Sequence, residues 1–196
     1  MLTINDDLRA ADATAVRATI DLVSRVTEAD LGRATPCAGW DLAALLEHMT
    51  EQHHVFAAAA RGAAAADGGD YAAAGGDDYA AAAEDVLAAF AGEGVLDRPF
   101  LLPEIGRPVP GRMAIGFHLV DYLVHGWDVA RTIGAPYRPG PDLLAPVLAI
   151  ARAVPDGPER RAPESPFAPA RPVPDGADAL TEILLLLGRD PDQPLR

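Results

Sequence analysis

A chain of 196 residues is long enough to form one domain with a well-buried core. Its formal net charge is -13 and its sixteen basic residues are all arginine, which argues against nucleic acid or an anionic membrane surface as a partner. The lone cysteine, Cys37, excludes an intrachain disulfide, and the N-terminus carries no apolar leader. These features predict a soluble cytoplasmic protein.

The first half of the chain predicts three helices. Apolar residues recur at helical spacing through 6–26, which indicates an amphipathic first helix. A second helix is expected to begin at Asp41, whose carboxylate can cap the free amides, and to run through Phe56. The segment 57–83 is rich in alanine and broken by glycine pairs, so we expect a mobile connection there. A third helix is predicted over 77–91.

The second half begins with a loop or short extended piece at 99–110, followed by a fourth helix over 112–133 that Gly134 closes. Short helices are predicted at 142–154 and 178–187. No segment alternates apolar and polar residues with a period of two for long enough to predict a strand. The economical fold is therefore an all-α four-helix bundle.

The distribution of proline sets the expected domain organisation. Residues 1–135 are expected to form the helical bundle. Residues 136–196 are expected to form a proline-rich C-terminal extension with short docking helices, which packs on the same domain as a tail and adds nothing to the core.

The fourth predicted helix carries a stripe of ionisable side chains. At about 100° per residue, His118, Asp121, His125 and Asp128 fall within about 80° of one another. The rest of this helix is apolar nearly all round, which is typical of a segment inside the protein. Because a buried carboxylate is costly without a partner, these groups should be hydrogen-bonded, paired or bound to a metal.

Asp121 and His125 lie one helical turn apart, so both side chains can reach a single point. Zinc, nickel or iron(II) needs three or four nitrogen and oxygen donors, and a third donor must come from a facing helix. His48 is the best candidate because it lies at the margin of the apolar face of the second helix. His118 is a candidate for a fourth ligand.

Other polar residues near this stripe have open roles. His118 and Asp128 could instead orient the ligands, since metal-bound imidazoles usually donate their second N–H to a carboxylate or carbonyl. Gln52, one turn after His48, could serve the same purpose. An Asp and His pair at this spacing is also common as a simple ion pair on a helix surface.

Three residues outside the stripe are not assigned to the metal. His53 and His54 fall on other faces of the second helix, so one is expected in the core and the other in solvent. Cys37 is expected to be a small buried hydrophobe, because a reactive thiol would need a depressed pKa. No catalytic residue is assigned.

Two stretches carry a family resemblance. They are Thr-Pro-Cys-Ala-Gly-Trp-Asp-Leu-Ala-Ala-Leu-Leu-Glu-His-Met at 35–49 and Asp-Tyr-Leu-Val-His-Gly-Trp-Asp-Val-Ala at 121–130. With the ending Leu-Gly-Arg-Asp-Pro at 187–191, they resemble the mycothiol-dependent maleylpyruvate isomerase metal-binding family of the DinB-like superfamily, in particular its uncharacterised actinobacterial members.

The resemblance implies a DinB-like four-helix bundle that holds a divalent metal through His48, Asp121 and His125. The isomerase pattern has glutamate where this chain has Asp121, so the acidic arm is shorter by one methylene. Members of the family that act on substrates use mycothiol or a similar low-molecular-weight thiol. Related bundles often pair, so a homodimer is also consistent with the resemblance.

Three functions follow from these residues. The leading hypothesis is a metal-dependent enzyme of thiol chemistry, which transfers a mycothiol-type thiol to a small electrophile or isomerises a thiol adduct. The alternative is a non-catalytic metal- or ligand-binding module. The third is a structural helical domain with a buried polar network.

Overall fold

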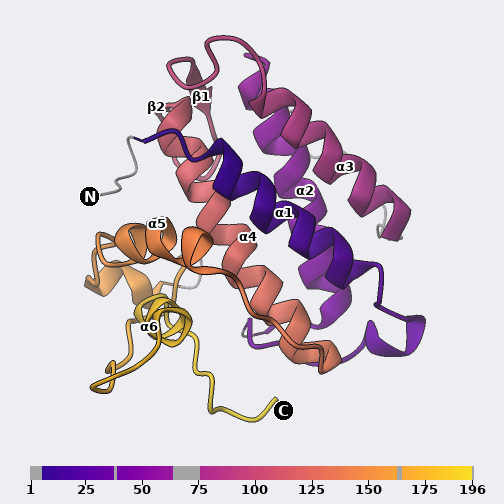
Figure 1. Cartoon of the computed structure of the whole chain (residues 1–196), viewed down its shortest axis with the longest axis vertical. Coiled ribbons are helices and arrows are strands. Elements are labelled where there is room, and N and C mark those ends of the chain that lie inside the picture. The colour runs from indigo at the N-terminus through magenta and orange to yellow at the C-terminus, as the bar shows by residue number, and fades with distance from the viewer. Residues whose placement is uncertain (1–5, 38, 64–75, 163–164, 196) are drawn as a thin grey trace.

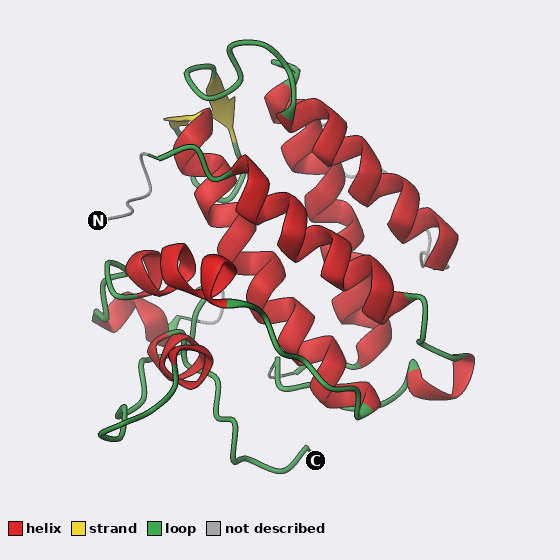
Figure 2. Cartoon of the chain, in the orientation of Figure 1, coloured by secondary structure: helices red, strands yellow, loops and turns green. Residues whose placement is uncertain are grey.

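The computed structural model describes residues 6–37, 39–63, 76–162 and 165–195 (Figure 1). The described helices are α1 (Arg9–Val23), α2 (Leu42–Ala60), α3 (Gly76–Phe90), α4 (Gly111–Ile133), α5 (Pro141–Ala151) and α6 (Ala179–Leu186), with single 3-10 turns at Glu28–Asp30 and Pro158–Arg161. Two three-residue strands, β1 (Pro99–Leu101) and β2 (Pro108–Pro110), pair antiparallel with Phe100 opposite Val109. The predicted all-α class is confirmed, and Figure 2 shows how little strand there is.

Helices α1 to α4 form the bundle. Helix α1 packs against α3 and α4, and α2 packs against the same two helices. Helix α4 runs through the middle of the molecule (Figure 1), and its residues from Tyr122 to Ala130 are all buried. Its central place explains why its sequence is apolar nearly all round.

The ends of the bundle helices follow local chemistry that the sequence shows. Asp41 caps α2, because its carboxylate accepts a hydrogen bond from the Ala44 amide at 2.9 Å. Gly134 ends α4 with a φ of 71°, a left-handed conformation that glycine adopts without strain. Both predicted boundaries are confirmed. Of the predicted mobile connection over 57–83, residues 57–60 belong to α2 and residues 76–83 to α3, while 64–75 lie outside the described residues.

The C-terminal extension contributes to the core. Helix α5 packs on α4, and α6 packs on α5 (Figure 1). Val147, Ile183 and Leu184 are at most 1% exposed and belong to the same buried cluster as the bundle residues. The expectation of a tail outside the core is therefore wrong. The two short helices were predicted, but their proline-rich flanks concealed that their apolar faces need a partner surface in the core.

The hairpin lies tightly against the first turn of α4. A Cβ atom on Gly111 would lie 1.9 Å from the Val95 carbonyl oxygen and 2.8 Å from the Phe100 ring. The Gly111 amide also donates to the Arg98 carbonyl at 2.8 Å. Only glycine allows so close an approach. In the part of the chain that the structure describes, no helix is both long and apolar enough to cross a membrane.

Candidate metal centre

Three side chains from two helices converge between α2 and α4. The ligand atoms of His48, Asp121 and His125 all lie within 4.8 Å of one another. The Nε2 atom of His125 is 3.2 Å from the Oδ1 atom of Asp121. The His48 and His125 rings meet nearly edge to face, with centroids 5.4 Å apart. The one-turn spacing on α4 supplies two groups, and the packing of α2 on α4 supplies the third.

The chemistry of these groups fits a divalent metal ion. Two imidazoles and one carboxylate suit zinc, nickel or iron(II). Donors that share one zinc ion at bond lengths of about 2.1 Å lie roughly 3–3.5 Å apart, and the His125 to Asp121 distance already falls there. The Asp121 side chain is 33% exposed while that of His125 is 7% exposed. The cluster is therefore accessible from the Asp121 side.

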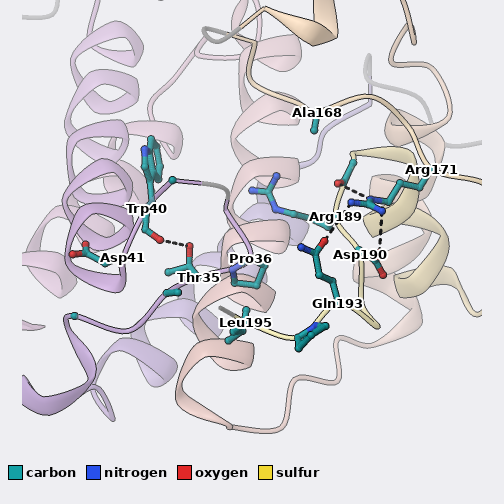
Figure 3. Close-up of a pocket in the computed structure, with 15 residues that line it drawn as sticks. Thr35, Pro36, Trp40, Asp41, Ala168, Arg171, Arg189, Asp190, Gln193 and Leu195 are labelled. Carbon is teal, nitrogen blue, oxygen red and sulfur yellow. Dashed lines mark hydrogen bonds and ion pairs between the residues drawn. The ribbon is translucent and has the colours of Figure 1, made fainter.

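Trp40 forms one wall of the cluster. Its ring centroid is 4.7 Å from that of His48 and 6.5 Å from that of His125, on which it stacks. The loop before α2 holds it in place, since the Thr35 hydroxyl donates to the Trp40 carbonyl at 3.0 Å (Figure 3). Trp40 thus belongs to the site, a role that spacing in the sequence does not reveal.

A cavity of about 510 Å³ lies between the residues around Trp40 and the C-terminal segment (Figure 3). Its lining includes Trp40, Arg171, Arg189 and Gln193, and His48, Asp121 and His125 are not among the described residues that line it. Trp40 lines this cavity and also contacts His48 of the cluster.

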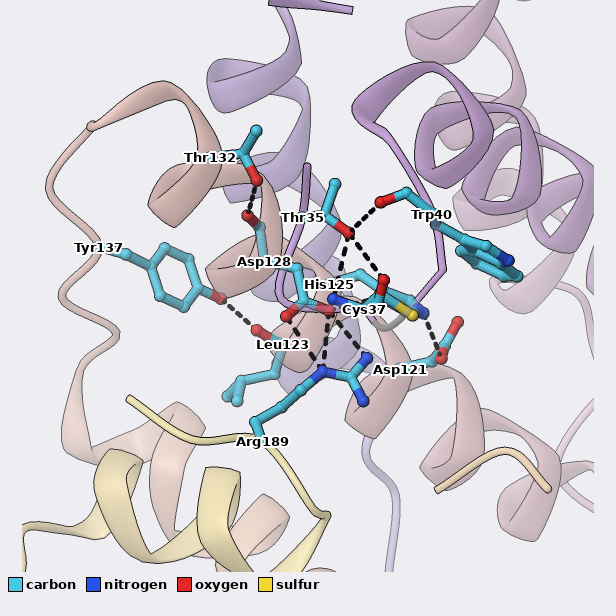
Figure 4. Close-up of polar contacts among 10 residues, drawn as sticks. All are labelled: Thr35, Cys37, Trp40, Asp121, Leu123, His125, Asp128, Thr132, Tyr137 and Arg189. Atoms are coloured by element: carbon cyan, nitrogen blue, oxygen red, sulfur yellow. Dashed lines mark hydrogen bonds and ion pairs between the residues drawn. The ribbon is translucent and has the colours of Figure 1, made fainter. Parts of the chain in front are cut away.

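Asp128 lies directly behind His125. The Nδ1–H of His125 donates to the Oδ2 atom of Asp128 at 3.0 Å (Figure 4). Because the carboxylate accepts at Nδ1, the Nε2 atom is left with the lone pair that a metal would need. Asp128 is fully buried, and Arg189 donates three hydrogen bonds of 2.9–3.2 Å to it. Arg189 lies 61 residues further along the chain and was not among the predicted site residues.

The charges of the cluster shift the pKa values of its members. Burial alone would lower the pKa of His125, but the carboxylates of Asp121 and Asp128 raise it to about 9. Burial would raise the pKa of Asp121, but His125 and His48 hold it well below its usual range. Burial lowers the pKa of His48. Without a metal at pH 7, His125 is therefore cationic and His48 neutral.

His118 lies away from the cluster, in a second buried group. Its Nδ1 atom bonds the Asp12 carboxylate at 2.7 Å, and its Nε2 atom shares a hydrogen bond with His53 at 3.3 Å. His118, His53 and Asp12 are all fully buried. The structure thus gives both ring nitrogens of His118 other partners, and does not place it as a fourth ligand or as a support for His125. The reason is that α1 presents a buried carboxylate on that side of α4.

Gln52 is turned toward a different carboxylate. Its side-chain amide donates to the Oε1 atom of Glu104 at 2.8 Å, in the loop between β1 and β2. Partial burial and the negative charge of Asp121 raise the pKa of Glu104. This hydrogen bond therefore fixes Glu104 beside Gln52. Sequence patterns could not find Glu104, because only the folded hairpin brings it there.

Two further predictions concern single residues. His53 is the core-facing member of its pair, as predicted, whereas His54 is half-buried and not in open solvent. Cys37 is half-buried, and burial raises the pKa of its thiol to about 11. The thiol therefore stays protonated at neutral pH, as expected for an unreactive cysteine, although Cys37 is not as fully buried as predicted.

The chain matches a known family. Residues 13–130 match the family model described as the mycothiol maleylpyruvate isomerase N-terminal domain. The chain belongs to this family, as its motifs predicted.

Its relatives include two proteins of Mycobacterium tuberculosis, Uncharacterized protein Rv0738 and Uncharacterized protein MT0763. Each is 35% identical to this chain over 184 residues, which is 92% of this chain and 94% of the relative.

Crystal structures of similar fold are those of the mycothiol-dependent maleylpyruvate isomerase and of a histidine-to-alanine mutant of it. Their TM-scores are 0.56 and 0.59, at 15% and 13% identity, over 77% of this chain and 72% of each solved chain. At this identity the likeness concerns the fold alone.

Proposed function

We propose that this protein holds a divalent metal ion through His48, Asp121 and His125 and uses it in the chemistry of a low-molecular-weight thiol of the mycothiol type. The reaction would be S-transfer to a small electrophile or isomerisation of a thiol adduct. The observation that carries the proposal is the convergence of three metal-ligating side chains within 4.8 Å, in a chain of this family. The thiol follows from the family, whose solved members are named mycothiol-dependent.

A bound divalent ion would supply positive charge that lowers the pKa of a coordinated thiol or water. The rest is done by the chain itself. His125 presents Nε2 because Asp128 holds the proton on Nδ1. Trp40 shields the two imidazoles on one side, which leaves the Asp121 side for a substrate.

Glu104, whose pKa is raised in part by the negative charge of Asp121, is the candidate for proton transfer. Its raised pKa brings it closer to neutrality than an ordinary glutamate, and Gln52 fixes one of its oxygens. We assign Glu104 as the group that takes a proton from an incoming thiol and returns it to the product.

The second candidate is a non-catalytic metal- or ligand-binding module. One observation favours it: His48, Asp121 and His125 are not among the described residues that line the cavity of Figure 3, so a ligand held there need not touch the three donor side chains. In that case the ion would stabilise the bundle.

Titration of purified untagged protein with ZnCl₂ and NiCl₂, followed by elemental analysis, tests the metal centre. We expect one ion per chain in the wild type, loss of binding in His125→Ala and His48→Ala, and unchanged binding in the control His54→Ala. Zinc bound equally well by His125→Ala would contradict the assignment.

Turnover separates the enzyme from the module. The metal-loaded protein is assayed for thiol-dependent conversion of maleylpyruvate and of general electrophiles. Turnover that depends on both the thiol and His125 supports the enzyme, whereas stoichiometric binding without turnover across the panel supports the module.

A further inference from the structure

The turn after α6 directs Arg189 into the protein. The Arg189 amide donates to the Leu184 carbonyl at 2.8 Å, and the Gly188 amide donates to the Leu185 carbonyl at 3.1 Å, which is the Schellman pattern of a helix end. Gly188 has a φ of 84°, and a Cβ atom there would lie 2.6 Å from the Ala168 carbonyl oxygen. This position therefore requires glycine, and the turn leaves Arg189 only 8% exposed.

Inside the protein, Arg189 holds Asp128 by both carboxylate oxygens. Its Nε atom donates to Oδ1 at 3.1 Å and to Oδ2 at 3.2 Å, and its Nη2 atom donates to Oδ2 at 2.9 Å (Figure 4). A planar guanidinium that binds in this way permits one orientation of the carboxylate. The same Oδ2 atom accepts the Nδ1–H of His125 at 3.0 Å.

A continuous series of hydrogen bonds thus joins the C-terminal segment to a donor of the cluster. Asp128 follows His125 by three residues on α4, so its carboxylate could rotate away if nothing held it. Arg189 prevents this rotation. The orientation of the His125 ring, and the choice of Nε2 as its free nitrogen, then depend on a residue outside the segment 13–130 that the family model matches.

We propose that Arg189 is a positioning residue of the metal centre, which acts through Asp128 to hold the His125 ring in its metal-binding orientation. This inference rests on the metal-binding part of the proposed function and deepens it. It makes the C-terminal segment part of the centre. By thermodynamic linkage, metal binding must in turn favour the state in which the C-terminal segment is packed on the protein with Arg189 bonded to Asp128.

The test compares zinc affinity among arginine variants, measured by competition with a chromogenic chelator. Loss of a group that orients a metal ligand typically weakens binding about 10–100-fold, and we expect a loss of that size in Arg189→Gln. Arg189→Lys should recover only part of it, because an ammonium group cannot bind both oxygens of Asp128 in the fork geometry. The visible spectrum of the Co²⁺ form should change in Arg189→Gln, since the His125 donor is misaligned.

The matched control is Arg152→Gln. Arg152 joins α5 to α6 through an exposed ion pair with Glu182 at 2.7 Å, without any contact to Asp128. Its loss should leave zinc affinity and the Co²⁺ spectrum unchanged. Equal zinc affinity in the wild type and Arg189→Gln would overturn the inference while leaving the proposed function intact.

A measurement on the wild type decides the question even if Arg189→Gln fails to fold. Amide hydrogen exchange of residues 184–190 is followed with and without ZnCl₂, and we expect slower exchange in the zinc-bound protein. Identical exchange in the two states would overturn the inference. A wild type that binds no zinc would overturn the metal centre itself and the inference with it.

Discussion

The ring of Trp40 lies against the ring of His48, with centroids 4.7 Å apart. The loop before α2 therefore forms one side of the candidate metal centre. The contact places an indole chromophore next to a metal donor. Trp127, the other tryptophan, lies buried on α4. The two residues therefore offer a matched pair of reporters.

Nickel binding should quench the fluorescence of Trp40, because a paramagnetic ion held by His48 would lie close to the indole ring. We expect Trp40→Phe to lose most of the nickel-dependent quenching and Trp127→Phe to keep it. A fluorescence titration with NiCl₂ at constant ionic strength measures both. Quenching that survives in Trp40→Phe but disappears in Trp127→Phe would place the ion elsewhere.

Zinc binding should release about one proton per ion at pH 7.5, because metal ligands must give up their protons on binding. The released proton comes from His125, whose carboxylate neighbours raise its pKa to about 9, whereas the lowered pKa of His48 leaves that ring already neutral. Zinc affinity should accordingly rise with pH up to about pH 9. Calorimetry in two buffers with different ionisation enthalpies gives the proton count, and a count of zero would contradict the assignment of His125.

The metal-free protein should lose stability as the pH rises from about 6.5 to about 9. A histidine whose pKa is higher in the folded state stabilises the fold below its unfolded pKa, and this contribution is lost as the pH rises through the folded value. For His125 the contribution is on the order of 3 kcal/mol. Urea unfolding at several pH values in the presence of a chelator measures it. His125→Gln should remove the part of the pH dependence of the unfolding free energy that His125 contributes. A wild type with equal stability at both ends of the pH range would contradict the raised pKa of His125.

Asp12→Ala should destabilise the protein by about 1–3 kcal/mol, because it leaves the buried Nδ1–H of His118 without an acceptor. Thr14→Ala, at an exposed position on the same helix, is the control and should cost far less. Urea unfolding gives both values. Zinc affinity should be the same in Asp12→Ala and the wild type, since Asp12 and His118 belong to a separate group; a large loss of affinity would show that the two groups are coupled.

The bundle was predictable because its signals are local. Helical periodicity places α1 to α4, the Asp41 carboxylate marks the start of α2, and Gly134 marks the end of α4. The one-turn spacing of Asp121 and His125 is local in the same sense, which is why two of the three clustered donors could be paired from the sequence.

The rest depends on contacts between distant segments. The angular positions of the residues around α4 could not show that His118 would form a hydrogen bond with Asp12 of α1. The stripe on α4 lies between two neighbouring helices, and the sequence does not say which of them each side chain meets. Arg189 and Glu104 reach the site only through the docking of the C-terminal segment and of the hairpin. Glu104 carries no pattern that distinguishes it from a solvent-exposed charge, and Arg189, although it stands in the Leu-Gly-Arg-Asp-Pro ending, carries none that points to Asp128.

Gly111 has a consequence for motion in this protein. The close approach of Val95 and Phe100 leaves no free space between the hairpin and the first turn of α4, and close-packed interfaces transmit a shift instead of absorbing it. A shift of Val95 or Phe100 must therefore be passed on to the first turn of α4. The helix that carries Asp121 and His125 is thereby coupled to the hairpin, and so is α2, through the hydrogen bond from Gln52 to Glu104.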